Sequence, residues 1–164
     1  MFKLKYAQRL PLSLEESWDF FSSPKNLKIL TPGHLGFEIQ KDFEDKKMYA
    51  GQIIAYTIRP VFNIPLEWVT EITQVNEPYF FIDEQRFGPY KFWHHEHRFN
   101  SIVGGVEIVD TIYYKMPFGL IGRFLHFAKV KGDLEAIFSF RHQKLEELFG
   151  LYSGNVIDPT DFVI

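Results

Sequence analysis

Hydrophobic and polar residues alternate over much of the chain, which is the pattern of half-buried β-strands. The first alternating segment covers residues 2–10. A helical pattern follows, because Ser13 and Glu16 have the spacing of a capping box, and this predicts a helix that ends before Pro24. A second short helix is predicted from Pro24 to about Leu30.

Alternation with a period of two returns at Leu35 and continues to Lys115, interrupted by turn residues. Such a pattern is typical of a meander of antiparallel strands. Six strands are predicted, over residues 35–43, 49–59, 64–75, 79–87, 90–100 and 105–115. The turns between them fall at residues 45–47, 60–63, 76–78, 88–89 and 104–105.

A helical period resumes after Pro117 and continues to Phe149. A straight helix of about thirty residues would be roughly 45 Å long, more than a domain of this size needs, so we expect a bend or break near Gly132. The fold class is therefore α+β, in the order βααββββββα, with a seven-stranded curved antiparallel sheet around a long C-terminal helix. We expect residues 1–149 to form a single domain and residues 150–164 to form an irregular tail.

Composition narrows the range of functions. The 164 residues include no cysteine, which suits a reducing compartment and predicts a cytoplasmic protein. Interspersed charges with a net value of -3 argue against nucleic acid as a partner, and no run has the length of a membrane span or the form of a secretory signal. The 18 Phe, 8 Tyr and 3 Trp favour either an aromatic core or an aromatic pocket for a small apolar ligand.

Successive side chains of a strand point to opposite faces of the sheet, and this alternation, here called strand parity, predicts which side chains face the interior. On the strand over 90–100, Trp93, His95 and His97 share one face, whereas Glu96 and Arg98 lie on the other. Because unpaired charges are costly to bury, the aromatic face is the inward one. The same test places further inward residues on this and the neighbouring strands: Trp68, Thr70, Ile72, Phe81, Asp83, Gln85, Phe99, Asp110, Ile112 and Tyr114.

The inward polar residues have two compatible interpretations. In the first, Asp83 and Asp110 accept hydrogen bonds from His95 and His97, and the network fixes the register of the sheet. In the second, the same groups orient a polar atom of an apolar ligand. The second interpretation predicts a pocket lined by Trp68, Phe81, Asp83, Gln85, Trp93, His95, His97, Asp110, Tyr114, Phe124 and Phe138.

Two chemical alternatives use some of these residues. Asp83 or Asp110 could form an acid and base pair with His95, as a cyclase or hydrolase would need. The His95-x-His97 pair could ligate zinc or iron, but Ser101 and Ile102 stand where the cupins place the following carboxylate. Signatures of nucleophilic hydrolases, phosphate loops, dinucleotide sites and zinc proteases are missing. We therefore expect binding without catalysis, and no metal or other cofactor.

Three segments carry a family resemblance: W-x-H-x-H-x-F over residues 93–99, the glycine pair at 104–105, and P-F-G at 117–119. Together with the order of elements over residues 2–149, they resemble the ligand-binding branch of the SRPBCC superfamily. That superfamily also contains START lipid-transfer domains, the birch-pollen allergen family and polyketide cyclases. The resemblance implies a helix-grip fold whose cavity, between sheet and C-terminal helix, receives lipids, hormones or polycyclic compounds. It does not choose among carriers, sensors and enzymes.

The tail leaves a third functional class open. Residues 156–164 are apolar enough to dock on another protein or on a second copy of the chain, which would make the protein an interaction module or a homodimer.

Overall fold

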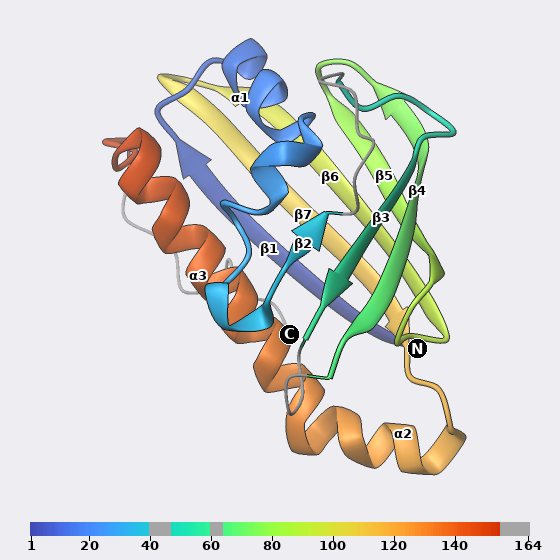
Figure 1. Cartoon of the computed structure of the whole chain (residues 1–164). Coiled ribbons are helices and arrows are strands. Elements are labelled where there is room, and N and C mark those ends of the chain that lie inside the picture. The colour runs from blue at the N-terminus through green and yellow to red at the C-terminus, as the bar shows by residue number, and fades with distance from the viewer. Residues whose placement is uncertain (40–46, 60–63, 155–164) are drawn as a thin grey trace.

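Residues 1–39, 47–59 and 64–154 are described by the computed structural model, and their strands form one antiparallel sheet. The order across the sheet is β1-β7-β6-β5-β4-β3-β2, so β2 to β7 lie side by side in sequence order and β1 pairs with β7 (Figure 1). This confirms the predicted seven-stranded sheet, with a meander of six strands after the first. The strands are β1 (Phe2–Leu10), β2 (Glu38–Ile39), β3 (Ile53–Ile58), β4 (Leu66–Asn76), β5 (Phe80–Phe87), β6 (Phe92–Ile102) and β7 (Gly105–Lys115).

The helices precede and follow the meander. The predicted capping box is confirmed at the start of α1 (Leu14–Phe21), where the backbone N–H of Glu16 donates to the Ser13 hydroxyl. Two short 3-10 turns follow, at Pro24–Leu27 and Gly33–Leu35. After β7 come α2 (Gly119–Leu125), a π-helical turn (His126–Val130) and α3 (Lys131–Phe149). None of the helices in the described residues is long and apolar enough to cross a bilayer.

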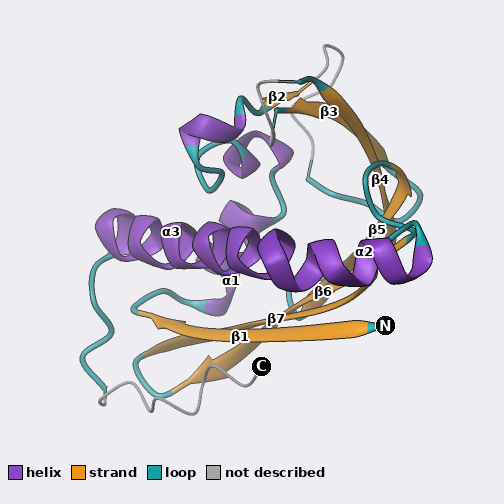
Figure 2. Cartoon of the chain, turned by 90° about the horizontal axis from the view of Figure 1, so that it is seen from below, coloured by secondary structure: helices purple, strands orange, loops and turns teal. Residues whose placement is uncertain are grey.

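The sheet curls around the side on which α3 lies, as Figure 2 shows. The long helix runs beside β1, and α1 covers one end of β6 and β7. Two groups of buried side chains fill the space between. The first, here called the α1 cluster, consists of Leu10, Trp18, Phe21, Leu30, Ile54, Ile72, Phe81, Phe99, Val106, Ile108 and Leu145. The second, here called the Trp68 cluster, consists of Leu4, Trp68, Trp93, Ile112, Tyr114, Leu134 and Phe138.

Two predicted strands are shorter than expected. In place of a strand from residue 35, the chain makes a 3-10 turn and then Gly36 in the left-handed conformation, so that β2 begins only at Glu38. The strand predicted from residue 49 begins at Ile53, because Gly51 turns the chain with a φ of +88°. Residues 40–43 of the first prediction and the predicted turn at 60–63 lie outside the described residues.

The C-terminal helical region changes direction, as predicted, but the cause is a π-helical turn rather than a break at a glycine. The irregular segment is His126–Val130, and Gly132 lies within the first turn of α3. In Figure 1, α2 lies beyond the end of the sheet, close to the N-terminus, whereas α3 runs along β1. The first part of the predicted apolar stripe therefore does not meet the sheet, and Leu120, Phe124 and Phe127 are exposed.

Candidate functional site

Four polar side chains meet on the concave side of the sheet, and they are here called the polar quartet: Asp83, His95, His97 and Asp110. They come from the three adjacent strands β5, β6 and β7. Register explains the meeting, because His95 lies opposite Asp83 on one neighbouring strand and His97 lies opposite Asp110 on the other. The period-two pattern of these strands is therefore sufficient to bring the four residues together.

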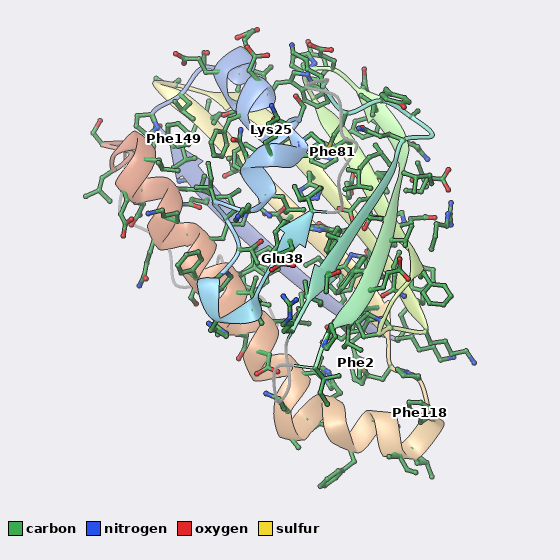
Figure 3. The ribbon with its side chains drawn as sticks, viewed as in Figure 1. Phe2, Lys25, Glu38, Phe81, Phe118 and Phe149 are labelled. Carbon is green, nitrogen blue, oxygen red and sulfur yellow. The ribbon has the colours of Figure 1, made fainter. Side chains whose placement is uncertain are left out.

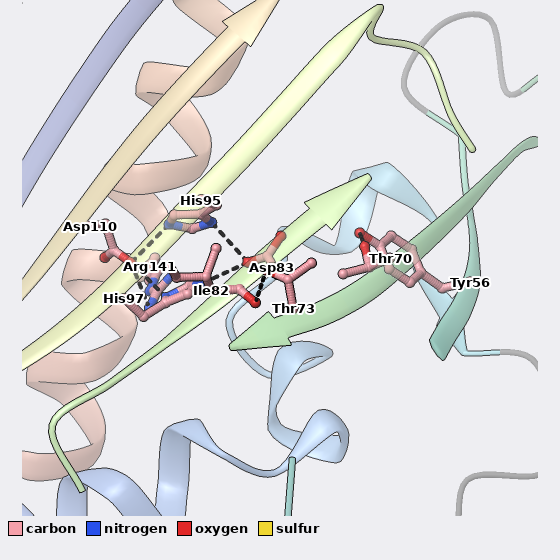
Figure 4. A network of polar contacts seen from close by, with 9 residues as sticks. All are labelled: Tyr56, Thr70, Thr73, Ile82, Asp83, His95, His97, Asp110 and Arg141. Carbon is pink, nitrogen blue, oxygen red and sulfur yellow. Dashed lines mark hydrogen bonds and ion pairs between the residues drawn. The ribbon is translucent and has the colours of Figure 1, made fainter. Parts of the chain in front are cut away.

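Each histidine of the quartet lies between the two aspartates (Figure 4). His95 Nε2 is 3.0 Å from Asp110 Oδ1, and His95 Nδ1 is 3.3 Å from Asp83 Oδ2. His97 Nε2 donates to Asp83 Oδ2 at 2.8 Å. His97 Nδ1 also lies 2.8 Å from Asp110 Oδ1, but without the orientation of a hydrogen bond. The predicted mutual hydrogen bonding of histidines and aspartates is confirmed.

A charged residue from the helix side completes this arrangement. Arg141 of α3 places Nη2 3.5 Å from Asp110 Oδ1, and its guanidinium lies over the rings of Phe21 and Phe138 at 5.2 and 5.8 Å from their centroids. Phe21 belongs to the α1 cluster and Phe138 to the Trp68 cluster. Arg141 and the quartet therefore lie at the boundary between the two clusters.

Burial and charge oppose each other in setting the protonation of the quartet. For Asp83, burial is outweighed by the charge of His95 and by hydrogen bonds from both histidines, which hold the pKa well below its usual range. For Asp110, burial is outweighed by the charge of Arg141 and by the same two histidines, again with a low pKa.

His95 shows the opposite balance. Burial alone would lower its pKa, but the charge of Asp83 and the hydrogen bonds with Asp110 and Asp83 raise the pKa to about 9. At neutral pH two carboxylates therefore face the imidazolium of His95 and the guanidinium of Arg141, and these four charges cancel.

Three members of the quartet could also ligate a metal ion. Asp83, His95 and His97 each offer one donor atom, and these atoms lie within 4.8 Å of one another. A metal would have to displace the protons that the histidines share with Asp83, since only unprotonated nitrogens coordinate. The present geometry is that of a satisfied hydrogen-bonded network, and the expectation of no metal stays a prediction.

Two hollows lie along the helix–sheet boundary. The smaller, of about 20 Å³, lies beside the quartet and includes Asp110, Phe138 and Arg141 in its lining, which is room for about one water molecule. The larger, of about 380 Å³, lies at the end of the sheet where α2 begins and is lined by Met1, Phe2, Lys91, Lys115, Met116, Phe118, Gly119 and Arg123. Figure 3 labels Phe2 and Phe118 at this end of the molecule. The acid–base alternative would need a substrate at the quartet, and the hollow there has water-sized volume.

Several solved structures share this architecture over most of their length. Protein Ms6760 from Mycobacterium smegmatis is 15% identical, with 89% of each chain covered and a TM-score of 0.63. Protein CV1439 from Chromobacterium violaceum is 10% identical, with 92% of this chain and 98% of that chain covered and a TM-score of 0.69. Ara h 8.0201, whose fold is that of the birch-pollen allergen family, is 12% identical, with 89% and 98% covered and a TM-score of 0.59.

This is the helix-grip fold. The fold expected from the sequence resemblance is therefore confirmed. No protein-family model and no curated protein matches the sequence. At identities of 10 to 15% the structural likeness establishes the fold, and the ligand has to be argued from the side chains.

Most predicted site residues face the interior of the helix-grip sheet, as strand parity indicated. The buried ones are Trp68, Phe81, Trp93, His95, His97, Asp110, Tyr114 and Phe138. Asp83 is half-buried within the quartet. Gln85 is also half-buried, but its amide bonds both backbone groups of Tyr90, so that it braces the β5–β6 turn.

The inward orientation expected for Phe124 is wrong. Its side chain is 72% exposed, because α2 extends past the end of the sheet and turns this side of the helix outward. The same placement applies to Leu120, which continues the exposed row.

Two interior polar residues were missed by strand parity because both belong to the C-terminal helical region. Arg141 lies on the apolar stripe of α3, and a charged residue at such a position indicates a buried partner. His126 lies eight residues before Leu134, hence on the same side of the helix; it stacks on Phe2 with ring centroids 3.5 Å apart and hydrogen-bonds to the Tyr114 hydroxyl at 3.1 Å. Burial and the charge of Lys131 lower the pKa of His126.

Proposed function

We propose that this helix-grip domain binds a small apolar molecule on the side of the Trp68 cluster, entering through the larger hollow. The observation that supports this is the hollow of about 380 Å³, which falls within the usual range of about 300–1,000 Å³ for ligand sites. Phe2 and Met116 line the hollow and also pack against the Trp68 cluster. An apolar guest in the hollow would thus lie against side chains that pack on the aromatic rings of the Trp68 cluster.

The aromatic rings in and beside the Trp68 cluster are in mutual contact. Trp68, Tyr90 and Trp93 have ring centroids 4.9 to 5.5 Å apart, and Tyr90 also contacts Tyr114. Flat rings present a large contact area with only two rotatable side-chain bonds each, which suits them to adjust around a guest. Each methylene group that such a guest buries would contribute about 0.8 kcal/mol.

The polar quartet contributes less to this proposal than the sequence indicated. Its members bond to one another and to Arg141, and the hollow beside them has a volume of about 20 Å³. We therefore place the ligand at the larger hollow and assign the quartet the role of holding β5, β6 and β7 against α3.

The position of the tryptophans provides the test. Trp68 and Trp93 lie in the proposed ligand cluster, whereas Trp18 lies in the α1 cluster. The neutral probe 1-N-phenylnaphthylamine should gain fluorescence with the protein, and energy transfer from tryptophan should persist in Trp18→Phe. Transfer should fall strongly in the double variant Trp68→Phe, Trp93→Phe, with Trp18 as the remaining donor.

Native mass spectrometry of the unaltered protein with the probe provides a second measurement, with a one-to-one complex as the expected result. Absence of both the complex and the fluorescence gain would contradict the proposal. Equal energy transfer in the two tryptophan variants would place the probe elsewhere on the chain.

A further inference from the structure

The segment formed by α2 and the following π-helical turn carries an apolar face that points away from the sheet. Leu120, Ile121, Phe124 and Phe127 are spaced so that they share one side of the helix, and each is between 64% and 84% exposed. The opposite side carries the buried His126. A surface helix normally directs its apolar side toward the core, so this helix is reversed.

Contacts on the sheet side fix α2 in this orientation. A Cβ atom on Gly122 would lie 1.8 Å from the Pro117 carbonyl oxygen, so the helix backbone is pressed closely against the segment that joins β7 to α2. His126 is held by Phe2 and Tyr114 through the stacking and hydrogen bond described above. These contacts therefore hold the apolar face of α2 in its exposed position.

Unpaired positive charges adjoin this face. Lys91, Lys115 and Arg123 line the larger hollow, whose lining contains no carboxylate. Ion pairs are found for many lysines and arginines elsewhere, but none for these three within residues 1–39, 47–59 and 64–154. Because the chain as a whole has a net charge of -3, this end is a local basic region on an acidic protein.

We propose that the α2 end docks on the surface of a bilayer that contains anionic lipids. Leu120, Phe124 and their neighbours would enter the boundary between headgroups and acyl chains, while the three cations would contact headgroup phosphates. This goes beyond the proposed ligand binding and does not depend on it.

Charge and shape favour a bilayer over other occupants. A second copy docking by the same face would bring two basic regions together, which is unfavourable for a two-fold interface. A nucleic acid would satisfy Lys91, Lys115 and Arg123 but would leave the apolar face in water. An anionic bilayer offers negative charge beside apolar material, which complements the cations and the exposed apolar side chains at this end of the molecule.

Sedimentation with sucrose-loaded vesicles tests the proposal. The unaltered protein should bind vesicles of phosphatidylcholine and phosphatidylglycerol, at roughly 3:1, at least about tenfold more strongly than vesicles of phosphatidylcholine alone. Raising NaCl from about 0.05 M to about 0.5 M should weaken binding to the mixed vesicles, because the headgroup contacts are screened. Equal binding to both vesicle types, or no binding to either, would overturn the proposal without any variant.

Two pairs of variants separate the apolar and charged contributions. Leu120→Ser with Phe124→Ser should lower vesicle binding at least about tenfold with little change in Tm, since both side chains are exposed. Val103→Ser is the matched control, because Val103 is 94% exposed in the β6–β7 turn at the opposite end of β6. The double variant Lys91→Gln, Lys115→Gln should bind vesicles more weakly and with a smaller dependence on salt. The control Lys5→Gln, Lys28→Gln changes the net charge by the same amount and should bind as the unaltered protein does.

Other outcomes have defined meanings. The unaltered protein could fail to bind vesicles and instead show a mass in solution that rises with concentration. If that rise were absent in the double variant Leu120→Ser, Phe124→Ser, the proposal would be overturned in favour of self-association. Probe binding measured without vesicles should be retained in the same double variant. A failure of ligand binding and a failure of membrane docking are thus observed in separate experiments.

Discussion

The two clusters of buried side chains lie under one sheet but differ in how they are closed. The α1 cluster is covered by α1, and Trp18 at its centre is 1% exposed with edge-on contacts to Phe81 and Phe99. Among residues 1–39, 47–59 and 64–154, no helix covers the outer edge of the Trp68 cluster, where Phe2 and Met116 border the larger hollow. Under the proposed function, the closed end of the helix-grip sheet would provide stability and the end with the larger hollow would provide access.

The polar quartet and Arg141 lie where the two clusters meet. His97 stacks on Phe81 of the α1 cluster with ring centroids 4.2 Å apart, and His95 contacts Trp93 and Phe138 of the Trp68 cluster. Buried charges of this kind often cost as much free energy as they return, and their attested use is to fix one arrangement of chains. Here they connect Arg141 of α3 to side chains of three adjacent strands, where the two clusters meet.

The largest expected effect comes from a cavity in the closed end. Trp18→Ala should lower the free energy of unfolding by about 3–5 kcal/mol, because it removes a fully buried ring from a closely packed site. Phe2→Ala, at the edge of the hollow, should cost less than half as much, since that ring is only partly buried. Urea unfolding followed by circular dichroism measures both. Similar losses for the two variants would mean that the two ends are equally packed.

Removal of one charge at the boundary between the two clusters should lower the free energy of unfolding nearly as much as Trp18→Ala does. Asp110→Asn removes the carboxylate that faces both His95 and Arg141, and breaking a buried ion pair in this way costs about 3–5 kcal/mol. The matched control is Glu107→Gln on the same strand, whose partner Arg9 lies on the exposed side, with an expected cost below about 1 kcal/mol. Comparable losses in the two variants would remove the special role of the boundary.

The pH dependence of stability should report the same network. His95 has its pKa raised from 6.5 to about 9, so its contribution is complete below pH 6.5 and is lost as the pH rises through 9. The aspartates have lowered pKa values, so their contribution is present above about pH 4 and is lost on acidification. The free energy of unfolding should therefore fall by up to about 3 kcal/mol between pH 6.5 and pH 9.

The groups that face His95 are Asp83, Asp110 and His97, with Arg141 behind Asp110. In His95→Gln the decrease above pH 6.5 should disappear. A decrease of the same size in that variant would assign the titration to another group.

Strand parity predicted most of the fold and the quartet because both depend on a period of two. Once His95 is known to face inward, its neighbours across β5 and β7 follow from the register. The same argument failed at β2 and β3, where Gly36 and Gly51 turn the chain by left-handed conformations that alternation does not reveal.

The helix side of the site was harder to predict, because the direction of a helix relative to a sheet depends on contacts distant in sequence. Helical periodicity correctly placed Phe138 in the interior. It could not show that the earlier part of the stripe, which includes Phe124, lies away from the sheet. The close approach of Gly122 to Pro117 and the stacking of His126 on Phe2 decide that point. A charged residue on an apolar stripe, as at Arg141, is the signal that would have found the fifth member of the network.

The smallest expected effect on stability lies at the accessible end. Phe118 has a φ of +62° and is 77% exposed, so the chain keeps a large residue in the left-handed conformation without burying it. A residue with a Cβ atom loses about 1–2 kcal/mol there, whereas glycine adopts the conformation readily at the expense of a more flexible unfolded chain. Phe118→Gly should therefore be as stable as the unaltered protein or more stable by up to about 1 kcal/mol.

Phe118→Ala serves as the control, because it removes the ring and keeps the strain. It should be less stable than Phe118→Gly by about 1 kcal/mol in urea unfolding, while the two variants lose the same amount of vesicle binding. That combination would show that the Phe118 ring serves contact with a partner, although a residue with a side chain at this position costs local stability. A loss of stability in Phe118→Gly larger than in Phe118→Ala would show instead that the ring supports the packing of α2, and the distinction between a closed and an accessible end would then no longer hold at this residue.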